Sequence, residues 1–265
     1  MSGYGLESDD AEAARLRRQA AGVHLVDAEL WPSAGVVPGA DVVDLGCGPA
    51  AVMLELAPMV GPQGSLTGVD ADPAMVARGR AAAEAAGADT VVVREGRAED
   101  SGLPTGSFDV ALVRLVLIHN GGRERAIVDH AASLLRPGGR VVLYDLDITM
   151  IRVQPPAAPV SELGERFLAY QEAVGNDPGV GLRLPELLEG AGLSVDDFRG
   201  TTRIGRRTAG TRGPTWAARR AMVDAGVATE DDLERWEREF AALDAQDTQP
   251  WMVGCVFVAV GRLPV

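Results

Sequence analysis

The sequence predicts an α/β fold in which a mostly parallel sheet of seven strands carries helices on both faces and ends with an antiparallel strand. Three observations favour it. Short β-branched apolar runs alternate with Ala-rich helical stretches along the chain, as in a parallel sheet with crossover helices. Gly- and Pro-containing turns separate these stretches. The 265 residues, 46% of them hydrophobic, suffice for one well-packed domain but not for two.

The first half of the chain supplies clear element boundaries. A first helix is expected over 9–30, capped by Asp9 or Asp10, and a Pro-Gly turn at 38–39 precedes a buried strand over 41–45. A helix over 50–60 ends at a Gly-Pro pair and is followed by a strand over 65–69. Asp72 caps the next helix, whose first residue is a proline and whose end is Gly87. Strands over 90–94 and 108–113 follow, the second after a Gly-Ser turn.

The second half continues the alternation less regularly. A helix over 122–135 stops at Pro-Gly-Gly, and a fifth strand over 140–144 begins at once. A stiff Pro-rich connector at 155–159 leads to helices over 161–174 and 185–189 and a sixth strand over 194–198. Helices over 215–225 and 230–243 precede the last strand, over 252–260. We therefore predict a single domain with an N-terminal helical cover (1–37), a ligand-binding core (38–147), a helical lid insertion (148–192) and a segment that completes the sheet (193–265).

Composition excludes several classes of protein. A formal charge of −13 disfavours a nucleic-acid surface, which needs clustered positive charge. All 25 basic residues are Arg, so a Walker A phosphate loop and Schiff-base catalysis, which both require Lys, are excluded. We find no membrane-length apolar stretch, no signal peptide and only two cysteines, so we expect a cytoplasmic protein without a disulfide framework.

The first strand is followed by a glycine-containing turn, Asp44-Leu45-Gly46-Cys47-Gly48-Pro49. Glycines at such a junction let the backbone approach a ligand, which meets the amide groups of the next helix. The second strand ends at Asp70, where a carboxylate can accept hydrogen bonds from both ribose hydroxyls of a nucleoside. Further motifs follow in order: Gly96-Arg97-Ala98-Glu99-Asp100, Leu103 to Asp109 before the fourth strand, and Leu134 to Gly139 before the fifth.

Together these motifs resemble the class I S-adenosylmethionine-dependent methyltransferases, which have a Rossmann-like fold, and within them the small-molecule group similar to the ubiquinone/menaquinone methylating enzymes. The resemblance covers residues 41–147 closely and the rest of the chain more loosely. It implies S-adenosyl-L-methionine as cofactor and a small metabolite as methyl acceptor, in secondary metabolism. It implies neither a nucleic-acid nor a membrane partner and is compatible with a homodimer.

The resemblance also implies roles for individual residues. The turn of Gly46, Cys47 and Gly48 would meet the methionine part of the cofactor, and Asp44 would position this turn and the ammonium group. Asp70 would hold the ribose, and Cys47 would be needed as a small residue rather than as a catalytic thiol. The remaining implied cofactor contacts are Ala71 and Met75 beside the adenine, Ala98 and Glu99 at its edge, Arg114 at the methionine end, and Gln19 in a leader helix over the cofactor.

Methyl transfer chiefly requires alignment of the acceptor with the methyl group, and a general base only when the acceptor arrives protonated. His119, which follows the fourth strand, is the first candidate base, although a structural histidine fits the same position. Asp145 and Asp147 leave the predicted fifth strand at the same edge, where solvated strand-end acids are also common. Tyr4 is a candidate to close over the site. We find no carboxylate set for a metal and predict a metal-independent reaction.

Seven arginines and no acidic residue lie between Phe198 and Val223. Because a guanidinium binds carboxylate or phosphate through a planar fork, part of this stretch could favour an anionic acceptor. Alternatively, these arginines pair with the acidic residues at 230–239.

Three alternatives to methyl transfer stay open. The fold could bind S-adenosylmethionine without methylating, as a cyclase or isomerase, or serve as a binding or regulatory module. A nicotinamide-dependent oxidoreductase also fits a Gly-x-Gly-x-x-Ala turn, but the sequence offers no hydride-site acid and base. The acceptor atom, whether O, N or C, is not specified.

Overall fold

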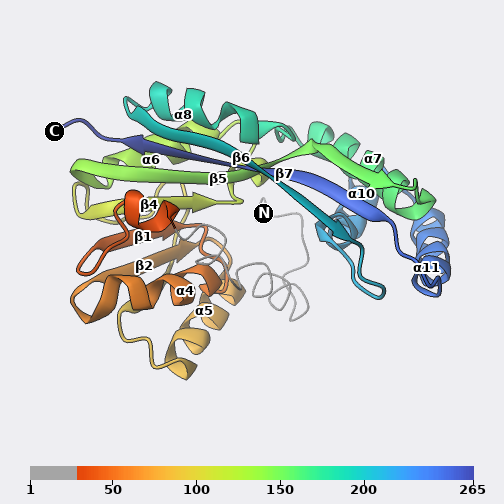
Figure 1. The fold of residues 1–265 in the computed structure, drawn as a ribbon, viewed down its shortest axis with the longest axis horizontal. Coiled ribbons are helices and arrows are strands. Elements are labelled where there is room, and N and C mark those ends of the chain that lie inside the picture. The colour runs from red at the N-terminus through yellow and green to blue at the C-terminus, as the bar shows by residue number, and fades with distance from the viewer. Residues whose placement is uncertain (1–28) are drawn as a thin grey trace.

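The protein, seen here in a computed structural model that describes residues 29–265, is built on one sheet (Figure 1). Its seven strands lie in the order β3-β2-β1-β4-β5-β7-β6. The strands are β1 Asp41–Leu45, β2 Ser65–Asp70, β3 Val91–Glu95, β4 Phe108–Arg114, β5 Leu135–Gln154, β6 Ser194–Arg206 and β7 Trp251–Arg262. All neighbours from β3 to β5 pair in parallel, while β7 runs antiparallel to both β5 and β6. The predicted fold class is confirmed.

Helices cover both faces of the sheet. The helices are α3 Leu30–Ser33, α4 Ala51–Val60, α5 Pro73–Ala85, α6 Glu124–Ser133, α7 Ala158–Ala173, α8 Leu184–Gly190, α9 Pro214–Ala217, α10 Arg219–Asp224 and α11 Glu230–Asp244, with short 3-10 turns η1 Gly61–Gln63, η2 Leu117–His119 and η3 Val180–Arg183. One buried cluster unites α3 and α4 with residues of β1 to β5, and the other unites α6 to α8 with the opposite face. The predicted cap of α5 is present, because the Asp72 carboxylate accepts the Ala74 N–H at 2.8 Å.

The strands of the second half are longer than predicted. The sequence predicts strands over 140–144 and 194–198, whereas β5 reaches Gln154 and β6 reaches Arg206. The reason is that β7 offers a long antiparallel partner: its residues pair with Asp145, Leu146 and Asp147 of β5, and after an irregularity with 152–154. The segment 148–154, which we assigned to the lid insertion, therefore belongs to the sheet.

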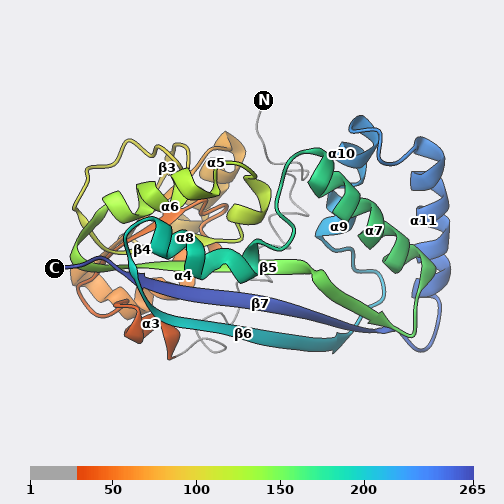
Figure 2. The same cartoon turned by 90° about the horizontal axis from the view of Figure 1, so that it is seen from above.

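Four helices form a lobe beyond the end of the core. Figure 2 shows α7, α9, α10 and α11 together at the far ends of β5, β6 and β7, while α6 and α8 stay over the core. The lobe has a buried apolar interior that includes Leu163, Phe167, Met222, Trp236 and Phe240. The predicted helix over 215–225 is divided into α9 and α10 at Ala218. The insertion after β5 thus contributes one helix, α7, to a lobe that the C-terminal segment largely supplies.

None of the helices within residues 29–265 combines the length and apolar character of a membrane span.

Candidate functional site

The glycine turn after β1 is fixed to the end of β2. Gly46 and Gly48 have φ angles of +79° and +54°, in the left-handed region that glycine adopts without strain. The N–H groups of Gly46 and Cys47 both donate to the Val69 carbonyl, at 2.7 and 3.1 Å. The Gly48 N–H donates to Oδ2 of Asp70 at 2.8 Å. The two motifs that the sequence singled out are therefore one hydrogen-bonded unit.

The same turn lies tightly against the segment that follows β4. A Cβ atom on Gly46 would lie 2.4 Å from Cγ2 of Val116, so no larger residue fits there without movement. Among the described residues, two other than glycine have positive φ, Ala50 at 59° and Leu115 at 57°. Both border this turn, Ala50 after it and Leu115 directly before Val116. Non-glycine residues in this region are strained and cluster at functional sites.

Asp70 is suited to hold a polar ligand at this edge. Its Oδ1 accepts the Asp72 N–H at 2.9 Å, so each carboxylate oxygen has one backbone donor and a lone pair left over. Burial raises the pKa of Asp70, while the backbone hydrogen bonds from Asp72 and Gly48 lower it. The carboxylate is thus oriented before a ligand binds, and its role in holding a ribose stays a prediction.

Asp44 lies beneath the turn with Arg114 as its charged neighbour. The Asp44 side chain is buried, and desolvation raises its pKa to about 7 although the positive charge of Arg114 lowers it. The guanidinium of Arg114 stands 4.8 Å from the centre of the Tyr144 ring. Its Nε is buried and has no hydrogen-bond partner within residues 29–265. This pair would face the ammonium and carboxylate groups of a methionine moiety.

Cys47 is buried, and desolvation raises the pKa of its thiol well above the usual value. A Cβ on Gly68 of the neighbouring strand would lie 2.7 Å from the Cys47 sulfur and 2.5 Å from the Met53 sulfur. Gly68 therefore cannot carry a side chain unless Cys47 or Met53 moves, whereas the need for a small residue at Cys47 stays a prediction. With its raised pKa, the thiol is not set up as a nucleophile.

The predicted adenine contacts lie at the ends of β2 and β3. Ala71 is exposed beyond β2, and Met75 is buried in the first turn of α5. Ala98 packs against the core. The Glu99 carboxylate accepts hydrogen bonds from Arg97 and, at 3.2 Å, from Arg123. Desolvation raises the pKa of Glu99, but its hydrogen bonds and the two guanidinium groups bring it below the usual range, so this acid is ionised.

His119 ends the 3-10 turn η2, which follows β4, and its side chain is half-buried. Val116, three residues before it, touches the glycine turn, so the histidine lies near the methionine end of the site. Its role as a base stays a prediction. Tyr4 and Gln19 lie outside the described residues.

Asp145 and Asp147 were expected to leave the fifth strand, and this is wrong, because both lie within β5 and are buried. Asp145 accepts the N–H groups of Leu146 at 2.9 Å and of Ile118 at 3.2 Å. Burial raises the pKa of Asp145 to about 7. Asp147 accepts the backbone N–H of Thr149 at 2.9 Å and its hydroxyl at 2.5 Å. Asp145 therefore holds the η2 turn from behind, and its predicted catalytic role has no support in these contacts.

Sequence reasoning missed the residues that attach η2 to α7 and to the segment after it. The buried Gln171 donates to the Ile118 carbonyl at 3.1 Å, and Asn176 accepts the Gly121 N–H at 2.9 Å. A Cβ on Gly121 would lie 1.8 Å from the Gly175 carbonyl oxygen. The one signal in the sequence was the glycine pair Gly121-Gly122. It indicates a turn, but it does not indicate which segment packs against that turn.

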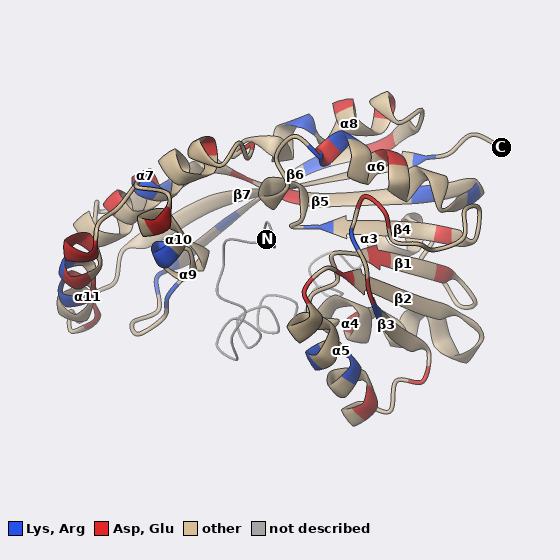
Figure 3. Ribbon diagram, turned by 180° about the vertical axis from the view of Figure 1, so that it is seen from behind, with Lys and Arg blue, Asp and Glu red and all other residues tan. Residues whose placement is uncertain are grey.

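The arginine-rich stretch has mostly structural partners. Arg207 and Arg212 both pair with Asp244, at 2.7 and 2.9 Å, and Arg220 pairs with the predicted acidic segment through Glu230 at 2.7 Å. Acidic and basic residues alternate along that segment, which is α11 (Figure 3). Arg207 is buried at 5% side-chain exposure, so it serves the helical lobe rather than an entrance.

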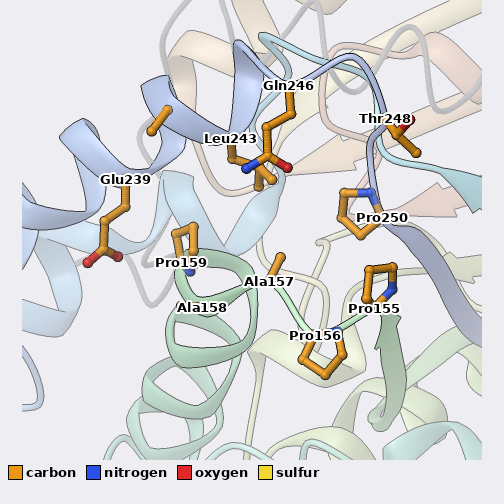
Figure 4. A pocket seen from close by; sticks show the side chains of 11 residues that line it. Pro155, Pro156, Ala157, Ala158, Pro159, Glu239, Leu243, Gln246, Thr248 and Pro250 are labelled. Atoms are coloured by element: carbon orange, nitrogen blue, oxygen red, sulfur yellow. The ribbon is translucent and has the colours of Figure 1, made fainter.

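A surface hollow lies away from this edge. It measures about 410 Å³ and is lined by Pro155 to Pro159, by the end of α11 and by Pro250 (Figure 4). Its proline-rich wall carries none of the predicted site residues, and the glycine turn remains the better candidate on chemical grounds. Within residues 29–265, no three His, Cys, Asp or Glu side chains are grouped as metal ligands, and metal independence stays a prediction.

Residues 42–139, which contain the glycine turn, Asp70 and β1 to β4, match the family model described as a methyltransferase domain. Residues 42–139 therefore form a methyltransferase domain. The cofactor that this family indicates is S-adenosylmethionine. The match ends at Gly139, within β5, so most of β5, all of β6 and β7 and the helical lobe lie outside the matched residues.

The curated relatives match only part of the chain. A nocamycin O-methyltransferase from Saccharothrix syringae is 40% identical over 106 residues, which are 40% of this chain and 38% of that protein. A demethylmenaquinone methyltransferase from Desulfitobacterium hafniense is 33% identical over 110 residues, 41% of this chain and 43% of that protein. The chain thus spans about two fifths of the length of these relatives.

The architecture extends further than the sequence match. The YcgJ protein from Bacillus subtilis superposes with a TM-score of 0.61 at 18% identity, over 91% of this chain and 99% of that one. At this identity the likeness shows the fold, including the sheet beyond the matched domain.

Proposed function

We propose that this protein transfers the methyl group of S-adenosylmethionine to an O, N or C atom of a small metabolite. The observation that carries the proposal is the hydrogen bond of 2.8 Å between the Gly48 N–H and Asp70. It joins a backbone turn open to a ligand with a carboxylate that has acceptor capacity left, which is what a nucleoside with an attached amino acid requires. The relatives named for nocamycin and demethylmenaquinone support a small acceptor in secondary or quinone metabolism.

The chain's own residues would act chiefly by alignment. When bound, S-adenosylmethionine supplies an electrophilic methyl group on a sulfonium. Asp70 would fix the ribose, while Asp44 and Arg114 would fix the amino acid end, so that the methyl group points past β4. The η2 turn, held by Asp145 and Gln171, would place His119 beside the acceptor, where it could take a proton from a protonated O or N atom.

Calorimetric titration with S-adenosylmethionine and with NAD tests the cofactor assignment. We expect the wild-type protein to bind S-adenosylmethionine and not NAD, and Asp70→Ala to weaken binding by at least about tenfold, since it removes hydrogen bonds to a charged acceptor. Asp89→Ala, at an exposed position, is the control for a general charge effect. Failure of a folded sample to bind S-adenosylmethionine, or NAD binding in its place, would overturn the proposal.

A second measurement separates methyl transfer from the cyclase, isomerase and binding-module alternatives. The protein is incubated with S-adenosylmethionine and a panel of phenols, amines, carboxylic acids and β-diketones, and S-adenosylhomocysteine is quantified. A methyltransferase accumulates S-adenosylhomocysteine in proportion to methylated product. Conversion of a compound without S-adenosylhomocysteine would favour a cyclase or isomerase.

A further inference from the structure

A row of charged and polar side chains runs along one face of the sheet across its carboxyl edge. Asp44 of β1 pairs in register with Leu112 of β4, and Arg114 pairs with Tyr144 of β5. Because side chains alternate along a strand and Leu112 belongs to the buried cluster under α4, Asp44, Arg114 and Tyr144 share that face. The row begins with the acid Asp44 on β1 and becomes basic from β4 onward.

Arg203 of β6 completes the row. Its Nη2 lies 3.4 Å from the Tyr144 hydroxyl, although β7 separates the two strands. Within residues 29–265 no carboxylate or carbonyl oxygen is recorded as its acceptor. The other six arginines of the 199–220 stretch each have one: Arg199 with Asp197, Arg206 with Gln249, Arg207 and Arg212 with Asp244, Arg219 with Trp216 and Arg220 with Glu230.

Arg114, on the other side of the Tyr144 phenol, also has a donor without an acceptor. Its guanidinium lies over the Tyr144 ring, and its buried Nε has no acceptor within the described part of the chain. Buried donors are rarely left without a partner. One phenol therefore stands between two guanidinium groups that have capacity for an anion, Arg114 above its ring and Arg203 at its hydroxyl.

We propose that Arg203 and the Tyr144 hydroxyl form an acceptor subsite that recognises a carboxylate, while Arg114, which lies over the Tyr144 ring, stays with the amino acid end of the cofactor. This inference rests on the proposed function, because the methyl donor would occupy the neighbouring turn at Gly46. A guanidinium and a phenol hydroxyl together provide charge-assisted and neutral donors to a carboxylate. The subsite lies away from Arg206 and Arg207, whose donors are taken up by Gln249 and Asp244.

The test uses two probes with the same ring system, 2-naphthoate and neutral 2-naphthamide, titrated calorimetrically into the full-length protein with and without S-adenosylhomocysteine. We expect 2-naphthoate to bind about fivefold more tightly than 2-naphthamide, as a partly exposed charged contact provides. Arg203→Gln should remove this preference. Arg199→Gln, four residues along the same exposed strand and already paired with Asp197 at 3.1 Å, should retain it.

Equal affinity for the two probes, no measurable binding of either, or a preference that survives Arg203→Gln would overturn the subsite. The proposed function and the subsite can fail independently, and the same titrations distinguish the two failures. If S-adenosylhomocysteine binds and the preference is absent, the subsite is wrong and the cofactor assignment stands. If the preference is present and lost in Arg203→Gln while S-adenosylhomocysteine does not bind, the cofactor assignment is wrong.

Discussion

At the scale of single residues, the site depends on a carboxylate that is buried before any ligand arrives. Asp44 is 4% exposed, and desolvation raises its pKa to about 7 despite the charge of Arg114. A bound ammonium group would stabilise the ionised form, so ligand binding and deprotonation of Asp44 are linked.

This linkage predicts a pH dependence of S-adenosylmethionine affinity. Below pH 7 the folded protein holds a proton on Asp44 that must leave before an ammonium group is bound, and above pH 7 it does not. We expect affinity to rise about tenfold between pH 6 and pH 8, measured by calorimetry in buffers of matched ionic strength. Asp44→Asn should bind more weakly with a flat pH profile. A rising profile that persists in Asp44→Asn would assign it to another group.

Gly46 offers a test of the space in the turn. In Gly46→Ala, the alanine would have to adopt a φ of +79°, and its Cβ would lie 2.4 Å from Val116. Gly39→Ala is the matched control, because its φ is +87° and nothing lies within 4 Å of the added Cβ. By urea unfolding, we expect a loss of about 1 kcal/mol for Gly39→Ala and about 2–4 kcal/mol for Gly46→Ala. Equal losses of unfolding free energy in the two variants would show that the contact with Val116 does not contribute to the destabilisation.

Residues on the cofactor side were predictable because their chemistry is local. Gly46, Gly48 and Asp70 are found at the ends of adjacent strands, where the order of the motifs predicts them. The place of Asp145 was not predictable, because its burial depends on β5 continuing beside β7. The contact of Arg203 with Tyr144 joins residues 59 positions apart, and no local pattern encodes it.

At the scale of elements, the η2 turn is held in place by contacts from two distant segments. Asp145 of β5 accepts the Ile118 N–H, and Gln171 of α7 donates to the Ile118 carbonyl. Asn176 in turn donates to the Gln171 side chain at 3.3 Å. The segment that bears His119 is thereby tied to α7, so a lid motion of α7 would displace it.

Replacement of Gln171 tests this attachment. Gln171→Met keeps the side-chain length but leaves the Ile118 carbonyl without its donor. We expect a loss of about 1–3 kcal/mol in the free energy of unfolding, the cost of an unsatisfied buried polar group. Glu172→Met, at the exposed neighbouring position, should change stability by less than about 0.5 kcal/mol. Similar values for the two variants would contradict the attachment.

Element type was more predictable than element length. Each predicted strand over 41–144 has its counterpart in the sheet, because these strands are buried apolar runs between turns. β6 extends to Arg206 through exposed polar residues that show no apolar alternation. Pairing with β7 determines their conformation, and a pattern of burial within one segment cannot reveal it.

At the scale of the whole molecule, the sheet links a ligand-binding core to a helical lobe that the family match does not include. In the lobe, the Asp244 carboxylate accepts the Gly210 N–H and pairs with Arg207 at 2.7 Å and with Arg212 at 2.9 Å. These contacts lower the pKa of Asp244 to about 2 although desolvation raises it. The core instead contains two carboxylates, Asp44 and Asp145, whose pKa values burial raises to about 7. The contributions of these carboxyl groups to the stability of the fold therefore change with pH in opposite directions in the lobe and in the core.

The sign of each response follows from proton binding. Asp244 stabilises the fold above the unfolded pKa of about 3.9, and this contribution is lost as the pH falls toward 2. Asp44 and Asp145 remain protonated in the fold up to about pH 7, whereas they ionise near 3.9 when unfolded. Their contribution to stability is complete below about pH 4 and is lost as the pH rises through 7.

The double variant Asp44→Asn, Asp145→Asn isolates this effect, because asparagine resembles the protonated acid at every pH. Between pH 5 and pH 8 we expect the wild-type free energy of unfolding, relative to that of the variant, to fall by about 2.5 kcal/mol for each of the two groups. Urea unfolding of the cofactor-free proteins at four pH values measures it. His130, whose pKa is lowered by desolvation, works in the opposite direction but is common to both proteins and cancels. Parallel curves for the two proteins would mean that neither carboxyl retains its proton in the fold, and the pH dependence expected for cofactor binding would then lose its basis as well.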